Sequence, residues 1–205
     1  LEGRGARIEA FSGRNSLGLS AGMLTQRFAE VAPVFAETLF NPALEESEFE
    51  HSKNVTLEDI RTIEDDSGRL VGRIFCENLF EGHPYAFPLI GYSDSVRGLS
   101  HGDLLKHYKQ LIQHAPMVVS VSGKFDSKKV IDIFEKIQRI NIGNASSKHL
   151  EWSGPKAPRL AEVKKSREQS HLVMGFRGTS VGTQDSYILR VLLTVLSGQS
   201  GRLFT

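Results

Sequence analysis

The stretch GHPYAFPLIGYSDSVRGLSHGDL, residues 82–104, carries two local signals that decide how the middle of the chain folds. A proline follows His83, and a residue before proline avoids the helical region, which predicts a turn here. Further along, Ser100 and Asp103 have the spacing of a capping box, with aspartate in the usual place of glutamate. This pair predicts the start of a helix that continues through Leu111.

Apolar side chains at helical spacing predict further helices on both sides of this stretch. A stripe from Leu24 to Leu39 contains Pro33, which we expect to kink or interrupt its helix. The other expected helices begin near Ser47, cover 71–79, begin at Ser127 and cover 185–196, the last with Ile188, Val191, Leu192 and Val195 facing inward. Such stripes need a partner surface, which a sheet can supply.

Three short apolar runs predict strands. Ile8–Phe11 enters a Ser-Gly turn, Met117–Val121 is a β-branched run typical of a buried strand, and Ser170–Phe176 follows later in the chain. We expect the first two runs to share one sheet, with the helices stacked against one of its faces.

Residues 139–165 lose this periodicity and are rich in glycine, serine, asparagine and proline. Such a composition is typical of an interdomain linker. We therefore place a first domain at 1–140, a linker at 141–165 and the beginning of a second domain at 166–205.

The composition excludes several classes of protein. The chain has 25 basic and 24 acidic side chains and a net charge of +1, so we expect neither nucleic acid nor an anionic membrane as a partner. No apolar run approaches the ~20 residues that span a bilayer, and no signal peptide is visible, so we expect a soluble segment of unknown compartment. The single cysteine, Cys76, cannot form a disulfide within the chain, and we expect it to be buried rather than reactive.

Several blocks of sequence follow one another in the order that one peptidase family has. They are IEAFS at 8–12, NPAL at 41–44, NVTLEDI at 54–60, GHPY at 82–85, PLIG at 88–91, LS at 99–100 with DL at 103–104, VVSVSG at 118–123, EQSH at 168–171 and GQSGRLF at 198–204. Together they resemble the insulinase/pitrilysin family of zinc metallopeptidases, whose zinc motif is the inverted His-x-x-Glu-His.

The resemblance implies an α+β fold. It implies a metallopeptidase-like domain, similar to that of mitochondrial processing peptidase, with a mixed or antiparallel sheet covered by helices. Residues 1–140 would form most of this domain without its start, and residues 166–205 would begin a second, similar domain.

The zinc-binding helix of that family has no counterpart in these 205 residues. A peptide-cleaving zinc site needs two histidines four residues apart on one helix, a third ligand and a general base. The seven histidines include no such pair, and no His-x-x-Glu-His occurs. The resemblance places that helix before Leu1, and the segment alone is expected to be inactive, with no catalytic residue of its own.

Three residues are candidates for a functional role: Asp59, His83 and Tyr85. The resemblance places the family's third zinc ligand, a glutamate, at Asp59 and a second acidic residue of the family at Ser52, and both departures indicate a degenerate copy. In the alternative interpretation, Asp59 is a solvated helix residue. His83 and Tyr85 line a substrate channel in one interpretation and form a packed turn in the other.

The resemblance therefore implies a segment of a zinc-dependent metalloendopeptidase, in a non-catalytic half that encloses and binds peptide. The alternative is a catalytic half whose zinc helix lies upstream. Zinc is expected in the full-length protein if a catalytic copy is present, and none is expected in this segment. The expected partners are a peptide or unfolded protein substrate and the remainder of the same protein or a homologous subunit.

Overall fold

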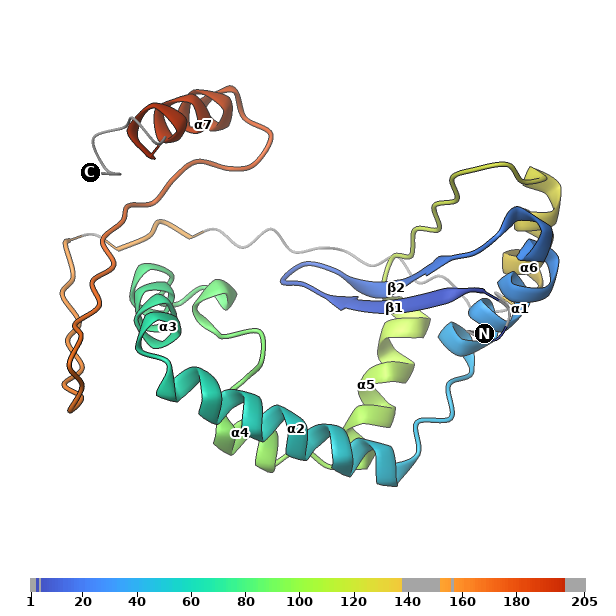
Figure 1. Ribbon diagram of the computed structural model, residues 1–205, viewed down its shortest axis with the longest axis horizontal. Coiled ribbons are helices and arrows are strands. Elements are labelled where there is room, and N and C mark those ends of the chain that lie inside the picture. Colours follow the sequence, from blue (N-terminus) through green and yellow to red (C-terminus); the bar gives the residue numbers. More distant parts are fainter. Residues whose placement is uncertain (1–2, 4, 138–151, 156, 198–205) are drawn as a thin grey trace. The chain divides into compact units, whose positions relative to one another are not determined.

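The computed structural model describes residue 3 and residues 5–137, 152–155 and 157–197 (Figure 1). The described residues fall into two compact units, one formed within 1–65 and 88–150 and the other within 66–87 and 151–205. Residues 141–151 and 156 of the expected linker lie outside the described residues, and so does the block GQSGRLF at 198–204. The proposed domain boundaries stay a prediction.

The first unit begins with an antiparallel hairpin of β1 (Arg7–Ser12) and β2 (Leu17–Gly22). The predicted strand at the start of the chain is thus confirmed. Its partner was missed, because a glycine-rich segment has little strand propensity. Phe11 pairs with Gly18 across the hairpin, and a Cβ at position 18 would lie 2.8 Å from Cζ of the Phe11 ring. The absence of a side chain at this glycine lets the ring cover the neighbouring strand.

Two of the three predicted strands are wrong. Met117–Val121 and Ser170–Phe176 form no strand, since the sheet of the described residues contains only β1 and β2. Val118, expected to be buried, is 87% exposed. β-branched residues favour strands, but a strand also requires a neighbour to pair with, which local sequence does not encode.

The described residues of the first unit also form five α-helices. They are α1 (Phe28–Phe40), α2 (Glu46–Asp65), α4 (Ser93–Arg97), α5 (His101–His114) and α6 (Ser127–Ile137), with the short 3-10 helix η2 (Thr25–Arg27) before α1. α1 contacts α6, and α2 contacts α4 and α5. The side chains of Val31 and Ile60 are almost fully buried. α1 is continuous through Pro33, so the helix has no break there, and the alternative of a kink at Pro33 stays a prediction.

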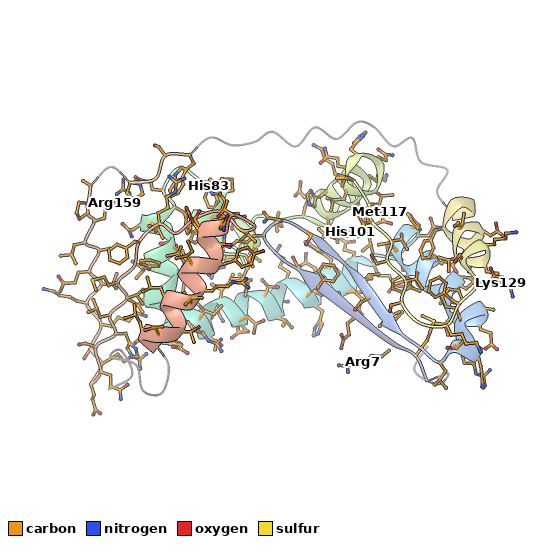
Figure 2. The ribbon with its side chains drawn as sticks, turned by 90° about the horizontal axis from the view of Figure 1, so that it is seen from above. Arg7, His83, His101, Met117, Lys129 and Arg159 are labelled. Carbon is orange, nitrogen blue, oxygen red and sulfur yellow. The ribbon has the colours of Figure 1, made fainter. Side chains whose placement is uncertain are left out.

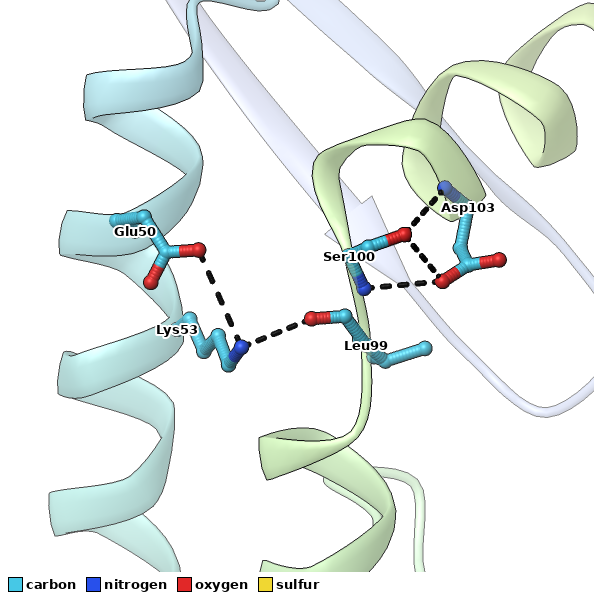
Figure 3. Close-up of polar contacts among 5 residues, drawn as sticks. All are labelled: Glu50, Lys53, Leu99, Ser100 and Asp103. Carbon is cyan, nitrogen blue, oxygen red and sulfur yellow. Dashed lines mark hydrogen bonds and ion pairs between the residues drawn. The ribbon is translucent and has the colours of Figure 1, made fainter.

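Polar contacts fix the start of α5 against α2 (Figure 3). The Lys53 ammonium donates to the Leu99 carbonyl at 2.8 Å and lies 3.9 Å from the Glu50 carboxylate. The predicted capping box is confirmed, because the Ser100 N–H donates to the Asp103 carboxylate at 2.9 Å and the Asp103 N–H donates to Oγ of Ser100 at 3.2 Å. The Ser100 side chain, followed by its backbone N–H, lowers the pKa of Asp103 from its ordinary 3.8.

Two side chains of α5 hold the end of α1 and the connection from α1 to α2. Nε2 of His101 donates to the Leu44 carbonyl at 2.6 Å, and Leu44 has a φ of +45°. The Tyr108 hydroxyl donates to the Leu39 carbonyl at 2.8 Å, and burial raises the pKa of Tyr108 from 10.0. A leucine in the left-handed region carries steric strain, and the bond from His101 holds it in place.

The second unit contains α3 (Ser67–Leu79), the 3-10 helix η3 (Pro84–Ala86), α7 (Gln184–Ser197) and the extended segments between them. Asp66 caps α3 by accepting from the Gly68 N–H at 2.9 Å and the Arg69 N–H at 3.1 Å. The bond from the Arg69 N–H is the main cause that lowers the pKa of Asp66. Both cap bonds satisfy donors that the first turn of a helix leaves unpaired.

α7 confirms the predicted last helix, but its apolar residues do not face inward. Ile188, Val191, Leu192 and Val195 are all more than 45% exposed. Periodicity identifies the face that favours burial and gives no information on whether a partner surface is present. Among the described residues, no helix combines the length and apolar character of a membrane span.

Candidate functional site

The turn that follows α3 holds His83 and Tyr85, the two residues proposed as a peptide contact. α3 ends at its C-cap Phe80. Gly82 then has a φ of +77°, a conformation that glycine adopts without steric cost, and Pro84 begins η3. The helix end, the glycine and the proline therefore fix the direction in which the chain leaves α3.

The side chains of this turn form an aromatic cluster around His83, which is labelled in Figure 2. The Tyr85 N–H donates to Nδ1 of His83 at 3.1 Å, and the two rings meet edge to face with centroids 4.7 Å apart. The Phe80 ring lies 5.7 Å from the Tyr85 ring and 6.1 Å from the His83 ring. Because Nδ1 accepts a hydrogen bond, the imidazole in this geometry carries its proton on Nε2.

Trp152 completes the cluster from a distant part of the chain. Its ring lies 5.3 Å from the Phe80 ring and 5.4 Å from the His83 ring, measured between centroids. Its indole N–H donates to the Glu81 carbonyl at 2.9 Å. A half-buried tryptophan commonly places its apolar ring against other rings and gives its N–H one acceptor, as here.

Two arginines add charged contacts to the same place. The Arg177 guanidinium lies 5.3 Å from the centroid of the Trp152 ring, within the range of a cation–π contact. Arg159 forms an ion pair with the Glu81 carboxylate and donates to the Asn78 carbonyl at 3.4 Å. These contacts connect residues after 151 to the last turn of α3 and to the turn that follows it.

The extended segment before α7 lies against α3 at two points. His171 is next to Gly68 in the first turn, where a Cβ would lie 3.7 Å from Nδ1 of the imidazole. At Gly175 a Cβ would lie 2.7 Å from Cζ of Phe75, so the Phe75 ring contacts the backbone of this residue. The segment therefore runs beside α3 in the direction of the helix.

The sequence signals single out His83 and Tyr85, and they do not group Trp152 with these two residues. In the structure the Trp152 ring contacts the His83 ring and the Arg177 guanidinium. The contact with Glu81 joins residues that are 71 positions apart, and a local sequence pattern does not predict a contact between such distant residues. A tryptophan within a polar segment is a weak signal of a buried contact, because its large ring gains most from burial.

The described residues do not supply a zinc site. Asp59 and Ser52 are both exposed on α2. Zinc takes four ligands, mostly histidine and cysteine, and the described part of the chain contains no cluster of three or more His, Cys, Asp or Glu side chains that could hold a metal ion. The residues present therefore do not fit the metal that the resemblance implies, and a ligand role for Asp59 in a longer protein stays a prediction.

Comparison with known proteins identifies the family. The family model described as "Peptidase M16 inactive domain" matches residues 98–205, and the model described as "Insulinase (Peptidase family M16)" matches residues 1–92.

Relatives with curated names agree with this match. An uncharacterised zinc protease of Bacillus subtilis is 27% identical over 201 residues, which are 98% of this chain and 49% of the relative. A subunit of the bovine mitochondrial cytochrome b-c1 complex is 24% identical over 136 residues, which are 66% of this chain and 28% of the relative. The chain spans about half the length of the first curated relatives it matches.

A solved structure supports the fold. The peptidase M16 inactive domain from Pseudomonas fluorescens superposes with a TM-score of 0.65 at 20% identity, over 76% of this chain and 39% of that chain. The expected α+β fold of the insulinase/pitrilysin type is thus confirmed, with a small antiparallel sheet in the described residues. The order of the sequence blocks, the fold and the match over residues 98–205 show that the chain belongs to the insulinase (M16) family of peptidases.

Proposed function

We propose that the chain is part of a non-catalytic half of an M16 peptidase and that it contributes a surface that binds peptide. The match of residues 98–205 to the inactive domain of the family supports the first part of this proposal. Ser52 and Asp59 support it further, because neither offers the reach of a glutamate at the positions where the family resemblance places acidic residues.

The observation that carries peptide binding is the open edge of the β1–β2 hairpin. Within the described residues β1 pairs only with β2, so each strand has one edge without a strand partner. The N–H and C=O groups along such an edge can pair with an extended peptide, which then adds a third strand. Backbone pairing of this kind accepts many sequences, as a peptide-binding half requires.

Side chains near the hairpin turn can add apolar contacts to this pairing. Phe11 and Leu17 are both more than half exposed. Phe11 pairs with Gly18 and Ser12 pairs with Leu17, so the two apolar side chains point to opposite faces of the hairpin. A strand added at either edge therefore finds an apolar neighbour close to the turn.

Binding of an extended peptide without aromatic residues tests the proposal. Fluorescence anisotropy should show saturable binding of a labelled peptide of alternating valine and threonine. A fully N-methylated copy of that peptide should not bind, because it has no N–H donors for strand pairing. Equal binding of both peptides would contradict the proposal.

A pair of proline variants locates the binding edge. Adjacent residues of a strand direct their N–H groups to opposite edges, so Glu9→Pro and Ala10→Pro remove donors from opposite sides of β1. One variant should lose β1–β2 pairing, as measured by amide exchange, while the other keeps that pairing and loses peptide binding. If peptide binding survives in both variants, β1 does not form the binding edge.

A further inference from the structure

The aromatic cluster beyond α3 is divided between two segments that are distant in sequence. Phe80, His83 and Tyr85 belong to one continuous stretch, whereas Trp152 comes from 71 residues beyond Glu81. The first stretch forms a surface, and Trp152 is seated on it.

The surface is built by bonds that do not involve Trp152. The His83 N–H donates to the Phe80 carbonyl at 2.8 Å, and the Ala86 N–H donates to the His83 carbonyl at 2.9 Å. The Tyr85 N–H fixes the His83 ring through Nδ1. The His83 ring is thus oriented by its own turn, and the Phe80 ring packs on the Tyr85 ring of the same turn with centroids 5.7 Å apart, so the surface is preorganised for a ligand.

Trp152 makes this contact only with its ring and its indole N–H, which every tryptophan side chain has. Its ring contacts the rings of Phe80 and His83, and its N–H occupies the Glu81 carbonyl. Residues 152–155 belong to no helix or strand, so the ring can leave without the loss of a regular element. The Arg177 guanidinium over the ring is an additional contact that holds it.

We propose that Phe80, His83 and the Glu81 carbonyl form a receptor for a tryptophan side chain. Trp152 fills this receptor from within the chain, and a tryptophan of a bound peptide takes its place when Trp152 leaves. The role of the receptor in peptide recognition rests on the proposed function, whereas its affinity for an indole does not. Trp152 is then an internal competitor that limits the access of peptides with weakly binding side chains.

The first experiment removes the Trp152 side chain and measures the binding of a free tryptophan probe in its place. The Trp152→Ala chain should bind N-acetyl-L-tryptophanamide, measured by saturation-transfer NMR and calorimetry. The Trp152→Ala/Phe80→Ala chain, with an unchanged far-ultraviolet circular dichroism spectrum, should bind it at least tenfold more weakly. N-acetyl-L-phenylalaninamide should bind Trp152→Ala about two- to tenfold more weakly than the tryptophan probe. The phenylalanine ring has no indole N–H to donate to the Glu81 carbonyl. The proposal is overturned if Trp152→Ala does not bind the tryptophan probe or if removal of the Phe80 ring leaves its affinity unchanged.

If Trp152→Ala loses its helical signal, the unmodified chain decides the question. Trp152 is the only tryptophan, so its fluorescence reports on the receptor alone. N-acetyl-4-fluorotryptophanamide, whose ring does not fluoresce, should displace it, shift its emission to longer wavelength and increase its quenching by acrylamide. Arg177→Ala should lower the probe concentration required for this shift. An emission spectrum that stays unchanged at saturating probe in both chains would overturn the receptor.

These measurements separate the receptor from the proposed function. A single-residue probe cannot form a third strand, and the peptide used for the hairpin contains no aromatic residue. Failure of the probe to bind therefore leaves peptide binding at β1 intact, and failure of the peptide to bind leaves the receptor intact.

Discussion

At the scale of single residues, Tyr108 connects α5 to the end of α1 through one hydrogen bond to the Leu39 carbonyl at 2.8 Å. We expect Tyr108→Phe to lower the free energy of unfolding by about 1 kcal/mol at pH 7, because the carbonyl loses a donor in a partly buried place. Urea denaturation followed by circular dichroism measures this loss. Tyr187→Phe is the matched control, because Tyr187 is exposed on α7. This substitution should leave the free energy of unfolding nearly unchanged.

The same substitution should alter the alkaline limit of stability. Burial raises the pKa of Tyr108, so the folded chain holds this proton more tightly than the unfolded chain does. The resulting stabilisation is fully present below the ordinary value of 10.0 and is lost as pH rises through the raised value. Tyr108→Phe should therefore destabilise the chain less at alkaline pH than at pH 7. An equal loss at both pH values would contradict this linkage.

The candidate site could be predicted only where its signals are local. His83 and Tyr85 were proposed from a proline-containing turn and a family resemblance, and their role as peptide contacts stays a prediction. Trp152 and Arg177 could not be assigned to the same place, because their contacts depend on a return of the chain to α3. Residue types alone do not specify which distant surface a side chain will meet.

At the scale of elements, Lys53 holds α5 against α2 from a side chain that is only 17% exposed. We expect Lys53→Met to lower the free energy of unfolding by roughly 1–3 kcal/mol, because the Leu99 carbonyl loses a charged donor while the apolar stem is kept. Chemical denaturation measures the change. Arg61→Met on the same helix is the control. It removes an exposed ion pair with Glu58 and should lower the free energy of unfolding by about 0.5 kcal/mol or less. Equal losses in the two variants would show that the contact with Leu99 adds nothing specific.

Helices could be predicted well and strands poorly, for a physical reason. The start of α5 was predicted because the capping box between Ser100 and Asp103 is a contact within three residues. β2 was missed and Met117–Val121 was wrongly assigned as a strand, because a strand depends on a neighbour at any distance along the chain. The five-residue helix α4 was missed because it is too short to display a period.

At the scale of the whole chain, the absence of the zinc motif from these 205 residues makes a prediction about activity. These 205 residues contain no His-x-x-Glu-His, so we expect no hydrolysis of a fluorogenic peptide that a zinc chelator abolishes and added zinc restores. Stoichiometric zinc binding should also be absent in calorimetry. Chelator-sensitive cleavage by the purified chain would show that a metal site forms from residues other than those considered.

The contact between Trp152 and the turn after α3 has a consequence for synthesis on the ribosome. The turn is made 71 residues before Trp152, and at 5–20 residues per second this interval is roughly 4–14 s. During that time the rings of Phe80 and His83 lack their contact with Trp152. A nascent chain arrested before position 152 therefore presents an exposed aromatic surface. Chaperones that bind exposed aromatic side chains should crosslink to this surface until Trp152 has been synthesised and has left the ribosome.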